Sequence, residues 1–253
     1  SDDVHHMGRH LMIRICVNLA KTVNGTRYFF YKEYEYEHSK TKKVSVKRGF
    51  DYYLSIEEIS KAMGFIQGVT TNPKILVRDK SDLKHLYEET EGLKFFVQVN
   101  GESLETMELH FELLYKLFGT NIIYKVPITE VGLRFIAKKR DFDANLRFLG
   151  TTIYASLQAI WAIESGCDYL APYYNRIYNQ GNDPNKVIQE IRHYINQKAP
   201  HVEIIAASFK TVQQIVDAYD HGAHSVTAPY ELLMSTLNLE PVLKDVAAFS
   251  VLK

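Results

Sequence analysis

Cysteine is scarce in this 253-residue sequence, and the two cysteines form no pattern. Cys16 and Cys167 lie far apart, in no spacing typical of a metal site or a redox pair. Isolated thiols of this kind suit the reducing cytoplasm and argue against a fold that depends on disulfide bonds. We therefore expect a cytoplasmic protein that is held together by a hydrophobic core.

The sequence also lacks an excess of charge of either sign and any long hydrophobic run. Its 30 Lys and Arg residues balance 30 Asp and Glu residues, so the formal net charge is zero. No overall field attracts nucleic acid or an anionic membrane, and an anionic ligand needs a local cluster of cations. No apolar run approaches the roughly 18 residues that span a bilayer. We expect neither nucleic acid nor a membrane as a partner.

Three segments of different character follow one another along the chain. Residues 1–10, with His5 and His6 before Met7, resemble an expression remnant more than a targeting signal. Residues 11–54 are rich in β-prone residues, with Asn24-Gly25 typical of a hairpin turn, and are expected to precede or to include the first strand of the main fold. The tyrosines of this segment are more typical of a packed sheet than of a nucleic-acid stacking surface. Residues 55–253 are expected to form the main domain, and a regular repeat runs through it from Phe65 to Pro229.

Seven β–α units make up this repeat, each an apolar run followed by a segment of helical period. The expected strands are Phe65–Thr70, Lys94–Val99, Asn121–Val126, Leu146–Gly150, Tyr169–Ala171, Val202–Ala207 and His224–Thr227. Largely apolar runs are typical of parallel strands that are covered on both faces. The pattern predicts an α/β fold, either a (β/α)8 TIM barrel whose first strand is not assigned or a doubly wound open sheet.

One charged residue interrupts an apolar strand. Lys125 is flanked by Ile122, Ile123, Val126 and Pro127, and burial of its charge is costly unless it faces a polar cavity or loses its proton. Desolvation lowers the pKa of a lysine, and this is how lysines that form Schiff bases become nucleophiles. The alternative is a lysine on an edge strand whose amine reaches solvent. The strand context alone leaves both interpretations open.

Polar residues gather where the expected strands end, which is where a barrel assembles its active site. Five motifs lie there or begin within a strand: Gly-Val-Thr-Thr-Asn-Pro (68–73), Lys-Val-Pro-Ile-Thr (125–129), Leu-Gly-Thr-Thr-Ile-Tyr (149–154), Ala-Pro-Tyr-Tyr-Asn-Arg (171–176) and Ala-Ala-Ser-Phe-Lys (206–210). In this order and with similar gaps, they resemble the transaldolase and fructose-6-phosphate aldolase family, particularly its short members. The resemblance runs from about Ile56 to about Leu243.

The resemblance implies the TIM barrel of class I aldolases and a cofactor-independent enzyme of carbohydrate metabolism, in the pentose phosphate pathway, with no metal. Lys125 occupies the position of the family's Schiff-base lysine, whose amine attacks the ketone of a sugar phosphate. Asn72 matches the asparagine that contacts the bound ketose, and Thr70 and Thr71 are expected to line the same rim.

Gln98, Thr151 and Tyr173 match the family's cluster that holds a water molecule for proton transfer. Members of the aldolase type resemble this sequence in having glutamine and tyrosine, whereas transaldolases typically have glutamate and phenylalanine at those two positions. The resemblance therefore favours cleavage of a ketose phosphate such as fructose 6-phosphate over transfer of the three-carbon unit. A transaldolase is the alternative.

Arg176, Ser208 and Lys210 match the family's phosphate site, and Asn175 beside Arg176 is expected to bind the sugar. A guanidinium, a hydroxyl and an ammonium form a sensible anion clamp in a protein with no net charge. The implied partner is therefore a sugar phosphate.

The sequence departs from the family at the first strand, which ends in an aspartate in relatives. Asp51 is the nearest match, whereas a strand at Met12–Val17 would instead place Asn18 there. Lys74 replaces a small residue, and Tyr178 replaces an acidic one. These departures motivate a third hypothesis, a non-catalytic barrel with an interaction role. The family also implies a homo-oligomer, although the helical tail of this chain is short.

Overall fold

A computed structural model describes residues 10–13, 22–23, 26–27, 36–37, 45–46, 68–70, 83–89, 92–229, 232, 235–237 and 239–250. Seven strands within these ranges are parallel and pair in the order of the chain. They are β6 (Gly68–Thr70), β7 (Lys94–Gln98), β8 (Ile123–Pro127), β9 (Arg147–Ile153), β10 (Tyr169–Pro172), β11 (Glu203–Ala206) and β12 (Ser225–Pro229). A strand lies within or overlaps each of the seven expected ranges, with ends that differ by a few residues, and residues 65–67 of the first range lie outside the described residues.

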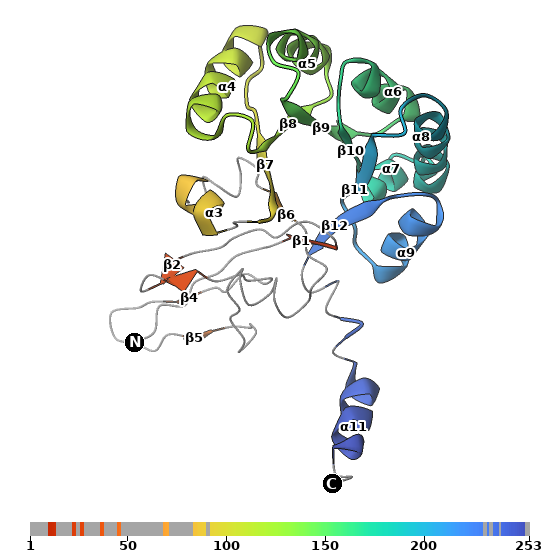
Figure 1. The fold of residues 1–253 in the computed structure, drawn as a ribbon. Coiled ribbons are helices and arrows are strands. Elements are labelled where there is room, and N and C mark those ends of the chain that lie inside the picture. The colour runs from red at the N-terminus through yellow and green to blue at the C-terminus, as the bar shows by residue number, and fades with distance from the viewer. Residues whose placement is uncertain are drawn as a thin grey trace.

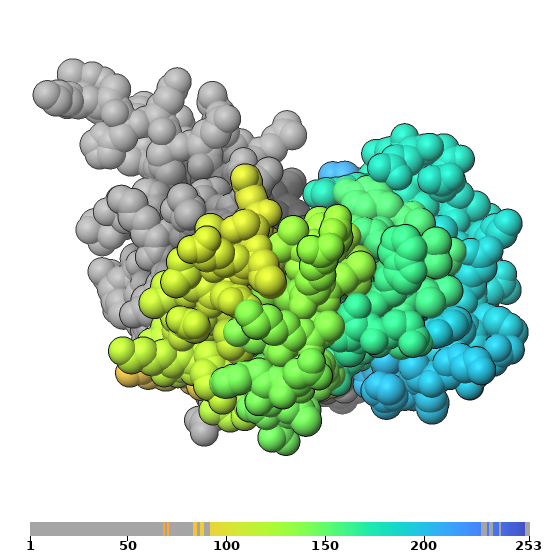
Figure 2. All heavy atoms as spheres, turned by 90° about the horizontal axis from the view of Figure 1, so that it is seen from above, coloured from red at the N-terminus to blue at the C-terminus, as the bar shows by residue number. Residues whose placement is uncertain are grey.

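Helices alternate with these strands and lie on the outside of the ring that the strands form (Figure 1). They are α3 (Leu83–Glu89), α4 (Leu104–Phe118), α5 (Glu130–Phe142), α6 (Ser156–Glu164), α7 (Tyr174–Asn179), α8 (Pro184–Lys198) and α9 (Val212–Asp220). A further helix, α11 (Glu240–Phe249), follows β12 and lies apart from the ring. The strand order never reverses, as it does in a doubly wound sheet. The fold is therefore of the TIM-barrel type. Figure 2 shows the coloured residues packed together from the yellow to the blue part of the chain.

The N-terminal segment contributes an eighth strand in an orientation that the repeat does not predict. β1 (His10–Ile13) pairs with β12 in antiparallel register, from His10 opposite Pro229 to Ile13 opposite Val226. β1 thus runs against the other strands and is not the parallel first strand of a (β/α)8 barrel. This direction weighs against the alternative in which a strand at Met12–Val17 leads to the active-site edge. Its first residue, His10, belongs to the stretch that the sequence assigned to an expression remnant.

Two short antiparallel pairs also lie in the N-terminal segment. β2 (Thr22–Val23) pairs with β3 (Thr26–Arg27), and β4 (Tyr36–Glu37) pairs with β5 (Ser45–Val46). The first pair flanks the Asn24-Gly25 dipeptide that is typical of a hairpin turn. The division of the chain at residue 54 and the role of this segment stay predictions.

Local sequence explains where the main helices begin. Ser103 caps α4, because its hydroxyl accepts from the Thr106 N–H while the Thr106 hydroxyl accepts from the Ser103 N–H. Thr129 and Thr211 cap α5 and α9 in the same way through their hydroxyls. Each cap lies within a few residues of the end of the preceding strand, so the chain turns outward there.

Alternating residues of the strands build two separate hydrophobic layers. The inner layer comes from the strands and the residue that follows β11, and it fills the barrel: Phe96, Ile123, Leu149, Tyr169, Ala171, Ile205 and Ala207, with Tyr173 packed against it. The outer layer packs the opposite strand faces against the helices, for example through the rings of Phe111, Tyr124, Phe135 and Phe148. Side chains two residues apart on one strand share a face, so the inner layer identifies which polar residues point into the barrel.

Phe148→Ala tests the outer layer. The Phe148 ring is fully buried against Tyr124 and Phe135, so its loss should lower the free energy of unfolding by about 3–5 kcal/mol. Urea unfolding followed by circular dichroism measures the change. Leu113→Ala serves as the control, because 64% of Leu113 is exposed. Equal losses in the two variants would contradict the described packing.

Candidate active site

Lys125 lies on the inner face of β8. Its strand neighbour Ile123, two residues away, belongs to the inner layer, whereas Tyr124 and Val126 belong to the outer layer. Lys125 is half-buried and lies two residues before the end of its strand at Pro127. The alternative of a lysine on an edge strand is excluded, because β8 is paired on both sides. The lysine side chain therefore points into the barrel near the carboxyl ends of the strands.

Gln98 stands directly beside Lys125 in the sheet. The two residues are register partners between β7 and β8, and neighbouring strands lie about 4.8 Å apart. Gln98 is the last residue of β7 and shares a face with the inner-layer residue Phe96. A neutral amide thus accompanies the lysine at the edge of the sheet.

Thr151 and Tyr173 form a hydroxyl pair at the same edge. The Thr151 Oγ1 and Tyr173 Oη atoms are 3.0 Å apart, and either can donate the hydrogen bond. Thr151 is almost fully buried and shares a face of β9 with Leu149, the register partner of Lys125. Tyr173 follows β10 and packs against the inner layer. Such a pair can bind a water molecule or relay a proton.

Arg176 lies above the Tyr173 ring. Its guanidinium carbon is 4.8 Å from the ring centroid, and its Nη1 donates to the Tyr154 hydroxyl at 3.2 Å. The hydrogen bond to Tyr154 raises the pKa of Arg176 above its usual value, so the guanidinium is charged at every physiological pH. The side chain is exposed and can bind an anion from solvent. Tyr173 thus contacts Thr151 through its hydroxyl and Arg176 through its ring.

Asn175, Ser208 and Lys210 come together where β10 and β11 end. The Asn175 N–H donates to the Ser208 carbonyl at 2.8 Å, which joins the two strand ends. Gln214 on α9 links Asn175 to Lys210, since its Nε2 donates to Asn175 Oδ1 at 3.0 Å and its Oε1 accepts from the Lys210 N–H at 2.8 Å. Ser208 and Lys210 therefore neighbour the segment that carries Arg176.

Two residues at this edge have strained backbones. Thr152 has a φ of 59° and Ser208 a φ of 66°, in the left-handed region that residues other than glycine rarely adopt. Among the described residues, Thr152 and Ser208 are the non-glycine residues with a positive φ. Thr152 follows Thr151, and Ser208 is hydrogen-bonded to the segment that carries Arg176. Such strain tends to collect at functional sites, where the surroundings hold it in place.

Several expected site residues lie outside the described residues. They are Asp51 with its alternative Asn18, and Thr71 and Asn72. Thr70 is described at the end of β6, where it is buried and pairs with Phe96. The roles of all the expected site residues stay predictions, although the described ones lie at one edge of the barrel.

Four polar residues at this edge were not predicted. Tyr154 closes a motif that the sequence shows, but its contact with Arg176 depends on the fold. Gln158, Gln214 and His110 lie on helices, and each binds backbone groups next to a strand end. His110 Nδ1 accepts from the Asn100 N–H at 3.0 Å, just beyond Gln98, and burial lowers the pKa of this histidine. No spacing in the sequence marks such contacts.

The described residues contain no cluster of three or more His, Cys, Asp or Glu side chains that could hold a metal ion. Cys167 is buried, and this burial raises the pKa of its thiol, which makes it a poor metal ligand. In the same ranges, none of the helices is long and apolar enough to cross a membrane.

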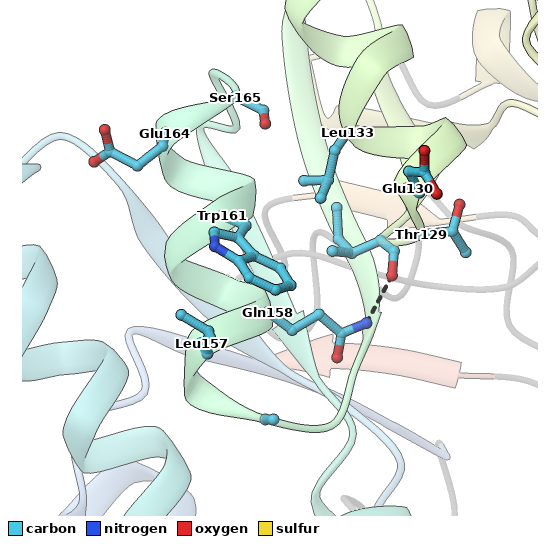
Figure 3. Close-up of a pocket in the computed structure, with 10 residues that line it drawn as sticks. Thr129, Glu130, Leu133, Leu157, Gln158, Trp161, Glu164 and Ser165 are labelled. Atoms are coloured by element: carbon cyan, nitrogen blue, oxygen red, sulfur yellow. Dashed lines mark hydrogen bonds between the residues drawn. The ribbon is translucent and has the colours of Figure 1, made fainter.

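A hollow of about 880 Å³ lies outside the barrel, between α5 and α6 (Figure 3). Its walls include Leu133, Leu157 and Trp161, and Gln158 reaches from it toward the end of β8. This hollow does not contain Lys125 or its neighbours.

Known proteins resemble this chain over most of its length. The model of the family described as transaldolase/fructose-6-phosphate aldolase matches residues 53–247. A probable fructose-6-phosphate aldolase from Streptococcus pneumoniae is 36% identical over 208 residues, which cover 78% of this chain and 91% of that protein. A probable transaldolase from Clostridium botulinum is 30% identical over 209 residues, which cover 76% and 92% of the two chains.

Arg176→Met tests the anion site. Loss of a charge-assisted contact of about 1.5–3 kcal/mol should weaken the binding of inorganic phosphate by roughly tenfold or more. Titration calorimetry measures the affinity. Arg134→Met is the control, since Arg134 is an exposed cation paired with Glu130 on α5. An equal loss of affinity in both variants would show that phosphate binding depends only on the net charge of the protein, and would contradict an anion site at Arg176.

Proposed function

Since the chain belongs to the transaldolase/fructose-6-phosphate aldolase family, we propose that it is a class I aldolase that cleaves and forms a ketose phosphate such as fructose 6-phosphate. Its products are then dihydroxyacetone and glyceraldehyde 3-phosphate. The observation that carries the proposal is Lys125 on the inner face of β8, next to Gln98 and close in the sheet to the Thr151–Tyr173 pair.

The reaction begins when the neutral Lys125 amine attacks the ketone carbon. Loss of water gives an iminium ion, and its positive nitrogen accepts the electron pair of the breaking carbon–carbon bond. The hydroxyl of the departing half loses its proton as its carbon becomes an aldehyde. The remaining enamine takes up a proton at carbon, and water hydrolyses the iminium to release the ketone and the lysine.

Two of these steps require proton transfer: the hydroxyl of the departing half loses a proton, and the enamine carbon gains one. Thr151 and Tyr173 supply two hydroxyls 3.0 Å apart, and Gln98 supplies an amide on the neighbouring strand. A water molecule bound among them accepts the hydroxyl proton and returns one to the enamine. Asp51, the nearest match to the aspartate that ends the first strand in relatives, is the proposed acidic partner.

Gln98 and Tyr173 also favour cleavage of the ketose phosphate over transfer of its three-carbon unit to an aldose phosphate. Gln98 and Tyr173 resemble the aldolase type, and a tyrosine hydroxyl can hold the water that protonates the enamine. In a transaldolase the enamine instead waits for an aldose phosphate. The relatives carry names of both kinds, so the family alone does not decide between them.

The phosphate of the substrate is proposed to bind Arg176, Ser208 and Lys210. Arg176 is exposed and permanently charged, and the other two follow β11 next to its segment. Asn175, Thr70, Thr71 and Asn72 are the proposed contacts to the sugar.

Lys125→Met tests the nucleophile. The variant should lose the cleavage of fructose 6-phosphate by a factor of at least about 10³, because no iminium can form without the amine. A coupled assay for glyceraldehyde 3-phosphate measures the rate. Lys94→Met is a matched control, since Lys94 is a lysine at the opposite, amino end of β7. The assignment of Lys125 as the nucleophile is wrong if the Lys125 variant stays active.

Product analysis separates cleavage from transfer. With fructose 6-phosphate alone, the protein should release free dihydroxyacetone, and added erythrose 4-phosphate should not increase turnover by more than about twofold. Tyr173→Phe should slow the release, because the enamine loses its proton relay. Turnover that depends on erythrose 4-phosphate would identify a transaldolase.

We also propose that the protein is a homo-oligomer and acts in the cytoplasm, as its scarce cysteines favour. α11 has no buried residue and stands away from the barrel (Figure 1). Val242, Leu243, Val246 and Phe249 form an exposed apolar stripe along it. An isolated helix this short is marginal in water, so contact with a second copy of the chain would stabilise it.

Val246→Glu and Phe249→Glu should dissociate the oligomer, because they place charge in the apolar stripe. Sedimentation velocity at several concentrations measures the association. Lys244→Gln is the control, since Lys244 pairs with Glu240 at 2.6 Å and remains exposed. A wild-type protein that sediments as a monomer at every concentration would contradict the proposal.

A further inference from the structure

One amide side chain joins β8 to β9 beyond the end of their backbone pairing. The pairing ends with the Ile128 N–H, which donates to the Thr151 carbonyl at 2.9 Å. From α6, Gln158 Nε2 donates to the Ile128 carbonyl at 2.7 Å, the dashed line in Figure 3, and to the Thr152 carbonyl at 3.1 Å. Its Oε1 accepts from the Tyr154 N–H at 2.9 Å. A single side chain thus satisfies three backbone groups on two strand ends.

These three bonds surround the strained, irregular end of β9 and the residue that follows it, Thr152 to Tyr154, here called the Thr152 turn. Thr152 is β-branched, has a φ of 59°, and its hydroxyl donates back to the Thr151 carbonyl at 2.6 Å. Such a backbone persists only where several contacts over-determine it. Gln158 binds the carbonyl of Thr152 itself and the N–H two residues later, so it holds both sides of the turn.

The turn connects two proposed parts of the site. Thr151 precedes it and pairs with the Tyr173 hydroxyl, whereas Tyr154 ends it and accepts from Arg176. The third bond of Gln158 reaches Ile128, three residues after Lys125 on the neighbouring chain segment. The amide therefore contacts the backbone next to the proposed nucleophile, the proton relay and the anion site at once, from outside the barrel.

Only a side chain with glutamine's groups can make this set of bonds. Two carbonyls require donors and one N–H requires an acceptor, which an amide supplies together. Glutamate has no donor and would face two carbonyl oxygens, and methionine can make none of the bonds. A charged or apolar residue here leaves buried or half-buried backbone groups without partners.

We propose that Gln158 is a positioning residue of the active site. It fixes the separation between the end of β8, which carries Lys125, and the Thr152 turn, so the Thr151–Tyr173 pair stays within reach of the carbon bound to the lysine. Gln158 itself touches no substrate. The inference rests on the proposed function for its catalytic consequence, while the bracing of the turn is independent of it.

Gln158→Met and Gln158→Glu test the proposal, with Gln189→Met, an exposed glutamine on α8, as the control. Deuterium uptake of the peptide spanning residues 150–156 should be faster in both Gln158 variants than in the wild type. The kcat for fructose 6-phosphate cleavage should fall by about tenfold to a hundredfold, because small misplacements of catalytic groups are that costly. KM and the extent of borohydride trapping on Lys125 should stay within about twofold, since the amine itself is intact.

Two results would overturn the proposal. One is a kcat within twofold of the wild type in both Gln158 variants, and the other is unchanged deuterium uptake at residues 150–156. Gln158→Glu keeps the shape of the side chain, so it replaces Gln158→Met if the latter is unstable. If the wild type gives neither cleavage nor trapping, the proposed function fails, and the uptake alone then decides whether Gln158 braces the turn.

Discussion

Parallel strands that pair side by side in one sheet have all their carboxyl ends at one edge, and the described site depends on that constraint. Neighbouring strands β7, β8 and β9 bring Gln98, Lys125 and Thr151 to this edge although they are far apart in the sequence. Alternation along each strand then decides which side chains face inward. Lys125 faces inward because Ile123 does, and the apolar inner layer beneath them closes the bottom of the site.

The site also requires that the ends of neighbouring strands keep fixed positions relative to one another. The inner layer cannot ensure this, because backbone pairing stops where the chain turns out to the next helix. Side chains from helices join the backbone there: His110 binds the backbone after β7, Gln158 joins the end of β8 to the end of β9, and Gln214 joins the segments after β10 and β11. At the opposite edge, Arg140 and Asp168 bind the amino ends of β9 and β10 and serve stability. The contacts at the amino ends of the strands thus stabilise the fold, whereas the proposed site lies at the carboxyl ends.

The sequence predicts most of this fold but only part of the site. The seven parallel strands are visible because strands buried on both faces are continuous apolar runs, and Lys125 is conspicuous as a charge within one of them. β1 was not predicted in its true direction, because its partner β12 lies more than 200 residues away and pairing direction leaves no local signal. The contact between Thr151 and Tyr173 was expected only from the family resemblance. Gln158 and Gln214 were missed because a glutamine on an amphipathic helix looks the same whether it faces solvent or a backbone carbonyl.

The account depends most on Lys125 as the residue that binds the substrate covalently. The most direct measurement is incubation with fructose 6-phosphate and sodium borohydride, followed by mass spectrometry of the peptides. The account predicts a stable adduct with the mass of the reduced three-carbon or six-carbon ketose on Lys125 and on no other lysine. An adduct elsewhere would contradict the assignment of the nucleophile. No adduct on the folded protein would contradict Schiff-base chemistry and would favour a non-catalytic barrel.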